Sequence, residues 1–214
     1  MYKNSFFIVF EGIEGSGKSY QAKILYNQIK KFTKNVVLTR EPGGTKSAEI
    51  IRKIILKDYF EKNKKIKFDK YTDTLLYLAA RNEHIKEKIL PALKNKKIII
   101  CDRFIDSTIA YQVYGKKIPL KFINFIHKHI LKKVRPDITF VLKVKKQSFL
   151  KRLRKRKIRN RYDNFPIKFY LKAQNAFLKI SKSKKSHIIL ESSENTPALQ
   201  KQIFKIIKKK LDLR

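Results

Sequence analysis

The sequence contains few residues of several types, and each shortage excludes a class of protein. Its 214 residues include a single cysteine, Cys101, so no internal disulfide can form and a disulfide-stabilised secreted scaffold is excluded. No run of about 18 apolar residues occurs, which excludes a transmembrane helix. The apolar stretch before Glu11 is too short for a secretory signal. We therefore expect a cytoplasmic protein without a membrane partner.

Acidic residues are also scarce: 17 Asp and Glu stand against 53 Lys and Arg, a formal net charge of +36. Such a charge can indicate a nucleic-acid-binding protein, which would bind DNA or RNA tightly even at ~0.2 M salt. It can also follow from codon composition, because residues with AT-rich codons are abundant whereas there are 6 Gly, 6 Pro and no Trp. Lysines occur on nearly every expected element instead of in one cluster, which favours the compositional explanation and no specific nucleic-acid partner.

Five short apolar runs rich in branched residues predict buried strands, at 6–11, 36–40, 97–102, 138–144 and 187–191. Helical periodicity lies between them, at 18–32, 45–57, 69–89, 120–132, 148–157, 165–181 and 197–211. Alternation of this kind predicts an α/β fold, with a five-stranded parallel sheet flanked by helices on both faces. No linker rich in Pro, Gly or Ser interrupts the pattern, so we expect a single domain over 1–214.

A phosphate-binding loop follows the first predicted strand. The stretch GIEGSGKS fits G-x-x-x-x-G-K-[ST] at every fixed position and precedes a predicted helix. Glycines let successive N–H groups turn toward one anion, and the helix N-terminus adds its dipole. Lys18 is expected to reach the β- and γ-phosphates, and Ser19 to ligate Mg²⁺. The predicted ATP-binding residues are Gly12, Ile13, Glu14, Gly15, Ser16, Gly17, Lys18 and Ser19.

Two further motifs follow predicted strands, where ligands bind in sheets of this kind. TREPGGT (39–45) is a weak signal, since a turn and a Thr45 helix cap would explain it. Asp102 and Arg103 could hold Mg²⁺ and a phosphate, although a helix-capping Asp with an incidental Arg is the alternative. On the helical stretch that comes next, one cleft wall could be lined by Ser107, Tyr111 and Gln112.

Tyr77 and Arg81 form an i, i+4 pair that would suit a nucleobase, with stacking from one and hydrogen bonds from the other. Taken alone, a core aromatic beside a surface arginine explains the pair better. The densest basic run, 151–161, would be a solvated or nucleic-acid-binding segment in most proteins. In a phosphate-loop kinase, however, arginines of a closing lid stabilise the charge of the transferring phosphoryl group. We expect such a lid at about 148–163.

Together these motifs resemble the thymidylate kinase family, whose members convert dTMP and ATP to dTDP and ADP. The resemblance rests on FEGIEGSGKS, TREPGGT, LLYLAARNEHI, DRFIDSTIAYQ, RPDITFVL and the basic lid, and it covers nearly the whole chain. It implies a P-loop NTPase fold of the nucleoside monophosphate kinase type, Mg²⁺ as cofactor, and a homodimer. It is closest to the bacterial type with a basic lid and no arginine in the phosphate loop.

The resemblance also implies roles for individual residues. Glu14 would face the sugar 3′-hydroxyl, Tyr77 would stack on thymine and Arg81 would hydrogen-bond it. Tyr111 would pack against C2′. The implied dTMP-binding set is Glu14, Arg52, Tyr77, Arg81, Arg103, Ser107, Tyr111 and Gln112. The implied catalytic set is Lys18, Asp102, Arg103, Arg152, Arg154 and Arg156, with Arg161 as a further lid arginine and Ser19 and Asp102 as metal ligands.

Several positions depart from the family pattern, among them Phe104 and Lys143, the turn at 113–117 and the lid stretch at 160–163. None of these removes an expected phosphate contact, but those in the lid bear on its geometry. A kinase for another nucleoside monophosphate is the rival within the same class. It would act on CMP, UMP or GMP and not on dTMP.

Overall fold

The computed structural model describes residues 5–57, 68–155, 165–194 and 196–213. Its five strands are β1 (Phe6–Glu11), β2 (Val36–Arg40), β3 (Ile98–Asp102), β4 (Ile138–Lys143) and β5 (His187–Glu191). They form one parallel sheet in the order β2-β3-β1-β4-β5. The predicted fold class and all five predicted strands are confirmed.

The helical segments are α1 (Lys18–Lys30), α2 (Lys46–Leu56), α3 (Lys70–His84), η1 (Ile85–Ile89), α4 (Leu90–Lys94), α5 (Ile105–Thr108), η2 (Ile109–Gly115), α6 (Leu120–Ile130), α7 (Lys146–Arg154), α8 (Ile167–Lys182) and α9 (Pro197–Leu211). The stretch predicted as one helix over 69–89 runs on to Lys94 through the π-helical turn η1. Pro91 lacks an N–H and cannot continue the regular ladder, which accounts for the irregularity just before it.

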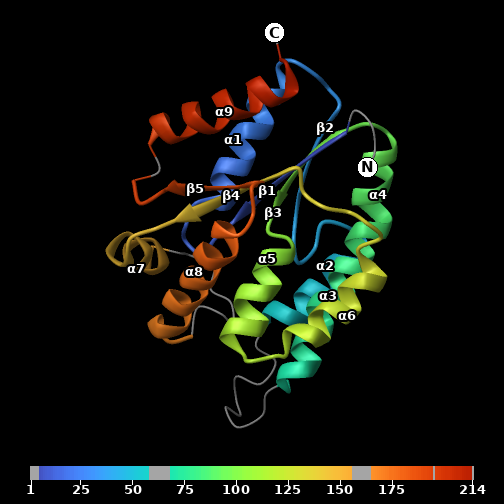
Figure 1. Ribbon diagram of the computed structural model, residues 1–214, viewed down its shortest axis with the longest axis vertical. Coiled ribbons are helices and arrows are strands. Elements are labelled where there is room, and N and C mark those ends of the chain that lie inside the picture. The colour runs from blue at the N-terminus through green and yellow to red at the C-terminus, as the bar shows by residue number, and fades with distance from the viewer. Residues whose placement is uncertain (1–4, 58–67, 156–164, 195, 214) are drawn as a thin grey trace.

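Both faces of the sheet are buried, as the continuous apolar strands predict. Along β1, Ile8 and Phe10 pack against α1 and α9, whereas Phe7 and Val9 face η1 and α4 on the other side. Farther along that second face, α8 packs against the end of β4 and against η2. Figure 1 shows α1 and α9 together on one side of the strands and α5 and α8 on the other.

Local signals explain where several helices begin. Thr45 caps α2 by accepting a hydrogen bond from Ala48 N, as predicted, and Asp69 caps α3 in the same way from Tyr71 N. Helix α9 begins with Thr196 as cap and Pro197 in its first turn. None of the helices in the described ranges is long and apolar enough to cross a membrane.

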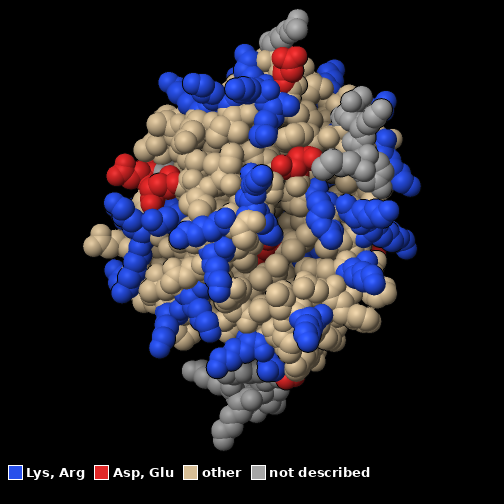
Figure 2. All heavy atoms as spheres, in the orientation of Figure 1, with Lys and Arg blue, Asp and Glu red and all other residues tan. Residues whose placement is uncertain are grey.

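Lysine and arginine side chains are spread over the surface in the manner expected from composition. Figure 2 shows them distributed over the face in view instead of gathered in one patch.

The glycines of the phosphate loop differ in how tightly the sheet encloses them. At Gly12 (φ +138°) a Cβ would lie 2.6 Å from the backbone oxygen of Leu142 at the end of β4, whereas at Gly15 (φ +68°) the nearest neighbour would be 3.5 Å away, in ordinary contact. We expect Gly12→Ala to lower the free energy of unfolding by about 2–4 kcal/mol, because the clash adds to backbone strain. Gly15→Ala, the matched control, carries the strain alone, about 1 kcal/mol.

Thermal or urea denaturation of the two variants and of the unmodified protein measures the difference. Equal losses in both variants would contradict the steric role given to the end of β4.

Candidate functional site

A cavity of about 520 Å³ opens at the carboxyl ends of β1, β2 and β3. Fourteen of the predicted site residues line it: Glu14, Gly15, Gly17, Lys18, Ser19, Arg52, Tyr77, Arg81, Asp102, Arg103, Ser107, Tyr111, Gln112 and Arg152. Six of its lining side chains are cationic and three are anionic, so the cavity favours anionic ligands. The structure therefore brings together residues that lie far apart in the sequence.

The phosphate loop connects β1 to α1, and its lysine folds back onto it. Lys18 Nζ donates to the carbonyl oxygen of Ile13 at 2.6 Å and to Ser16 Oγ at 3.4 Å. Burial, reinforced by the charge of Arg103, lowers the pKa of Lys18 to about 8, against the opposing effect of Asp102. Ile13 and Ser16 are buried behind the loop and do not line the cavity.

Ser19 and Asp102 meet at the floor of the cavity. Ser19 Oγ donates a hydrogen bond to Asp102 Oδ2. Asp102 Oδ1 is buried without a hydrogen-bond partner among the described residues. Oxygen donors of this kind are the ligands that Mg²⁺ prefers, so the pair fits the predicted metal site. The described residues contain no cluster of three or more His, Cys, Asp or Glu that could hold a metal by themselves.

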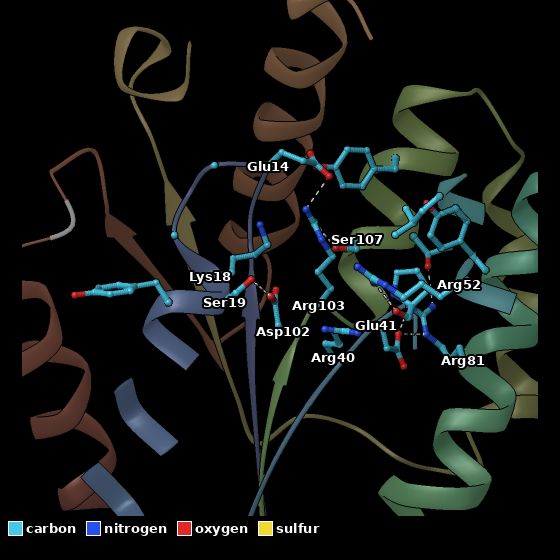
Figure 3. A pocket seen from close by; sticks show the side chains of 18 of the residues that line it. Glu14, Lys18, Ser19, Arg40, Glu41, Arg52, Arg81, Asp102, Arg103 and Ser107 are labelled. Carbon is cyan, nitrogen blue, oxygen red and sulfur yellow. Dashed lines mark hydrogen bonds and ion pairs between the residues drawn. The ribbon is translucent and has the colours of Figure 1, made fainter. Parts of the chain in front are cut away.

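Arg103 links the phosphate loop to the cavity wall on α5 and η2. Its guanidinium donates to Gly12 O at 2.9 Å, Ser107 Oγ at 3.1 Å and Glu14 Oε1 at 2.9 Å. Tyr111 OH donates to the other Glu14 oxygen at 2.5 Å. Burial opposes ionisation of Glu14, but the charges of Arg103 and Lys18 and the Tyr111 hydrogen bond hold its pKa below the usual value. In Figure 3 the Arg103 side chain lies between Lys18 and Ser19 on one side and the Glu41–Arg81 group on the other.

Arg81 is embedded in the far wall of the cavity. Its side chain donates to Glu41 Oε2 at 2.8 Å, Thr108 Oγ1 at 2.7 Å and Phe104 O at 2.8 Å, and lies 2.9 Å from His127 Nε2. These contacts engage all three of its nitrogens. The alternative of an incidental surface arginine is therefore wrong for Arg81, which is 3% exposed.

This buried network continues through Glu41, His84 and Thr39. None of the three was predicted from the sequence as a site residue. His84 Nδ1 lies 3.0 Å from Glu41 Oε1, and its Nε2 lies 2.7 Å from Thr39 Oγ1. Burial would raise the pKa of Glu41, but Arg81 and His84 lower it below its usual value. The only available signal was their place in the TREPGGT and ARNEHI motifs.

Two arginines lie at the mouth of the cavity beside the turn that follows β2. Arg52 donates to Pro42 O at 2.6 Å, and Arg40, also missed from the sequence, pairs with Glu49 at 3.0 Å. Burial and the charge of Arg40 lower the pKa of Arg52. Both side chains line the cavity.

Tyr77 and Gln112 also line the cavity. Gln112 is buried, and its Nε2 has no hydrogen-bond partner among the described residues. A buried amide in that condition calls for an acceptor from a ligand.

The predicted lid is described only in part. Arg152 on α7 donates to Gly15 O at 2.9 Å and to the carbonyl oxygens of Ser192 and Ser193 at 2.7 and 2.6 Å. Arg154 is exposed at the end of α7 and does not line the cavity. The predicted lid positions Arg156 and Arg161 lie outside the described residues.

His127 generates a pH dependence of stability. Burial and the neighbouring Arg81 charge, against the opposing charge of Glu41, lower its pKa to about 3, whereas an unfolded histidine titrates near 6.5. The stabilisation is present above pH 6.5 and is lost as the pH falls, because the unfolded chain takes up a proton that native His127 does not accept. Between pH 6.5 and pH 5 we expect the free energy of unfolding of the unmodified protein to fall by about 2 kcal/mol because of His127. His127→Gln should lack this fall.

Denaturation curves at several pH values measure this effect. His129→Gln is the matched control, since His129 is exposed on the same helix. Parallel pH profiles for the unmodified protein and His127→Gln would show that another group causes the acid sensitivity.

Comparison with known proteins agrees with this geometry. The family model for thymidylate kinase matches residues 10–203. A thymidylate kinase from Wolbachia pipientis subsp. Culex pipiens is 44% identical over 209 residues, covering 95% of this chain and 96% of its own. A thymidylate kinase from Rickettsia bellii is 35% identical over 99% of this chain and 98% of its own.

Among solved structures, the thymidylate kinase of Ehrlichia chaffeensis superimposes with a TM-score of 0.75 at 33% identity, covering 95% of this chain and 98% of that one. The sequence match, the sheet and the cavity thus agree over nearly the whole chain. The chain belongs to the thymidylate kinase family, which phosphorylates dTMP to dTDP with ATP in the synthesis of dTTP.

Proposed function

We propose that the cavity carries out this reaction by in-line transfer of the ATP γ-phosphoryl group to a phosphate oxygen of dTMP. The observation that carries the proposal is the position of Arg103, which bonds the phosphate loop at Gly12 and Glu14 and also lines the wall with Ser107 and Tyr111. A phosphate held there would lie beside the loop that binds ATP. Holding both substrates in one orientation supplies much of the rate in phosphoryl transfer.

On the donor side, the loop amides and the N-terminus of α1 would bind the ATP phosphates. Lys18 would exchange its contact with the neutral Ile13 carbonyl for contacts with the β- and γ-phosphates, whose negative charge it would neutralise. Ser19 and Asp102 would hold Mg²⁺. When bound, the ion would neutralise charge on the transferring phosphate oxygens.

On the acceptor side, Arg103 would grip the dTMP phosphate. Its contacts within the described residues occupy three of its five N–H donors, which leaves two for a ligand. Arg52, at the mouth, would add a second cation. The phosphate of dTMP is already ionised at neutral pH, so positioning and charge neutralisation suffice and no strong general base is needed.

The base and the sugar of dTMP would occupy the other end of the cavity. Tyr77 would stack on thymine, and Gln112 Nε2 would donate to one of its carbonyl oxygens. Contacts within the protein engage four of the five N–H donors of Arg81, and the NH2 nitrogen that carries the fifth also lies 2.7 Å from Glu41 Oε2, so at most this one N–H would reach the base. Glu14 and Tyr111 would face the deoxyribose, Glu14 toward the 3′-hydroxyl and Tyr111 toward C2′.

The lid arginines Arg152, Arg154 and Arg156 would stabilise the charge on the transferring group and exclude water. The hydrogen bond from Arg152 to the Gly15 carbonyl oxygen, beside the phosphate loop, supports this role for Arg152. We regard 1–214 as one domain with this lid. A cytoplasmic location fits the single buried thiol of Cys101.

The reaction is tested by measuring ADP formation from Mg-ATP with dTMP, CMP, UMP and GMP in turn. We expect turnover with dTMP well above the others, and a loss of at least about 100-fold in Lys18→Ala, because a preorganised charge at the phosphates is removed. Lys23→Ala, an exposed lysine on the next turn of α1, is the matched control and should keep full activity. Turnover with CMP, UMP or GMP but not with dTMP would disprove the assignment of the acceptor.

We also propose that the protein is a homodimer that pairs through α2, α3 and α6. Large apolar side chains are exposed on these neighbouring helices: Ile50 (62%), Tyr71, Leu75, Leu120 and Phe125 (65%). Tyr71 of α3 packs edge-on against Phe122 of α6, so apolar side chains of the two helices meet at this point. Contiguous exposed apolar surface is characteristic of an interface.

A charge placed in this face should separate the subunits. We expect Phe125→Glu to halve the mass measured by sedimentation equilibrium, since burying an unpaired carboxylate in an interface is costly. Ile189→Glu, which alters an exposed apolar side chain on β5, is the control and should stay dimeric. A monomeric unmodified protein, or a dimeric Phe125→Glu variant, would contradict the proposed interface.

A further inference from the structure

Glu11, the last residue of β1, is completely buried and accepts three hydrogen bonds from one short segment. Its Oε1 accepts from Phe104 N at 2.8 Å and from Ser107 N at 3.1 Å, and its Oε2 accepts from Ser107 Oγ at 2.6 Å. Phe104 occupies the cap position of α5 but supplies no side-chain cap. Glu11 thus caps, from a neighbouring strand, the turn that follows Asp102 and Arg103.

Ser107 passes this contact on to Arg103. A hydroxyl has one hydrogen and two lone pairs, and the hydrogen of Ser107 points to Glu11. A lone pair is therefore presented to Arg103 NH1, which donates to Ser107 Oγ at 3.1 Å. Glu11, Ser107 and Arg103 form a chain in which the carboxylate sets the direction of the serine.

The backbone of Arg103 needs such support. Its φ is +74°, in the left-handed region, where a residue other than glycine is less stable by about 1 kcal/mol or more. A residue in that conformation persists when surrounding contacts determine it, and the bonds of Glu11 to Phe104 N and Ser107 N fix the backbone that follows directly. The same carboxylate thus restrains both the main chain and the side chain of Arg103.

Stability alone does not account for a carboxylate at this position. Glu11 has no cationic hydrogen-bond partner among the described residues, and burial with the nearby Asp106 charge raises its pKa to about 7. A neutral amide acceptor could accept from the same two N–H groups without the cost of burying a charge. We propose that Glu11 is a positioning residue for acceptor binding, which orients the Arg103 guanidinium through Ser107 toward the dTMP phosphate.

The inference rests on the phosphate-binding role proposed for Arg103. It distinguishes two parts of the acceptor, because Arg103 would hold the phosphate whereas Tyr77 and Gln112 would hold the base. A defect in orienting Arg103 should therefore weaken binding of dTMP and leave binding of thymidine, which lacks the phosphate, unchanged. A general loss of structure in the cavity would weaken both.

The test is calorimetric titration of Glu11→Gln with dTMP and with thymidine, both in the absence of ATP. A separate kinetic assay measures the Michaelis constant for ATP. We expect the dissociation constant for dTMP to rise roughly tenfold, which is the effect on affinity of losing one well-aligned, charge-assisted hydrogen bond. Thymidine affinity and the ATP constant should stay within about twofold. Unchanged dTMP affinity, or parallel losses for dTMP and thymidine, would overturn the proposal.

A matched control lies near the opposite end of the same strand. Asp137 Oδ2 accepts a hydrogen bond from Phe7 N at 2.7 Å, so Asp137→Asn also neutralises a carboxylate that is bonded to backbone beside this sheet. It should leave the affinities for dTMP and thymidine as they are. An equal loss of dTMP affinity in this control would show that any disturbance of β1 has the same effect, and would overturn the proposal.

Two further variants separate the possible failures. Ser107→Ala removes the relay and keeps Glu11, so its effect and that of Glu11→Gln should be non-additive in the double variant. If Glu11→Gln does not fold, Ser107→Ala tests the proposal in its place. We then expect a lower affinity for dTMP and an unchanged affinity for thymidine, and an unchanged affinity for dTMP would disprove the relay. Full dTMP affinity in Arg103→Ala would instead refute the proposed role of Arg103.

Discussion

The parallel registration of β2, β3 and β1 determines where the functional side chains meet. Arg40 lies opposite Asp102, and Asp102 lies opposite Phe10, so the three strands end at one level. Each strand leads there into a polar turn: the phosphate loop, the turn at 41–45, and Asp102 with Arg103. A slip of one residue in any pair would turn these side chains to the other face of the sheet. The cavity therefore depends on backbone pairing that the apolar strand residues enforce.

The protein carries two populations of basic side chains. Those at the surface are numerous and spread out, and they follow from composition. Arg81 and Arg103 are different, because each is paired with a carboxylate of the cavity wall: Arg81 with the buried Glu41 and Arg103 with the half-buried Glu14. Three of the 17 acidic residues of the chain line the cavity, and two of these three, Glu41 and Glu14, orient Arg81 and Arg103. Net charge alone would have pointed to a polyanion-binding surface.

Apolar periodicity was sufficient to predict the sheet and most of the helices, since strands buried on both faces leave a plain signal in the sequence. Motif spacing identified the phosphate loop, and the position of Asp102 at the end of a strand pointed to the cavity, whereas Tyr77 was expected there only from the family resemblance; both line the cavity. Sequence could not identify Glu11 or His127, because nothing in the residues around them shows that these two polar side chains are buried and hydrogen-bonded. Their partners, Ser107 and Arg81, are distant in sequence and become neighbours only once the sheet and α6 are packed.

The bond from Arg103 to the Gly12 carbonyl joins the acceptor wall to the loop on which the donor nucleotide would lie. A ligand that draws Arg103 away from that carbonyl alters the loop, and a ligand that reshapes the loop alters Arg103. Linkage requires the two effects to be equal: the factor by which the acceptor changes the affinity for the donor is the factor by which the donor changes the affinity for the acceptor. The free energy of the ternary complex is the same whichever substrate binds first, because free energy is a state function, and this hydrogen bond is a route by which the first substrate would change the affinity for the second.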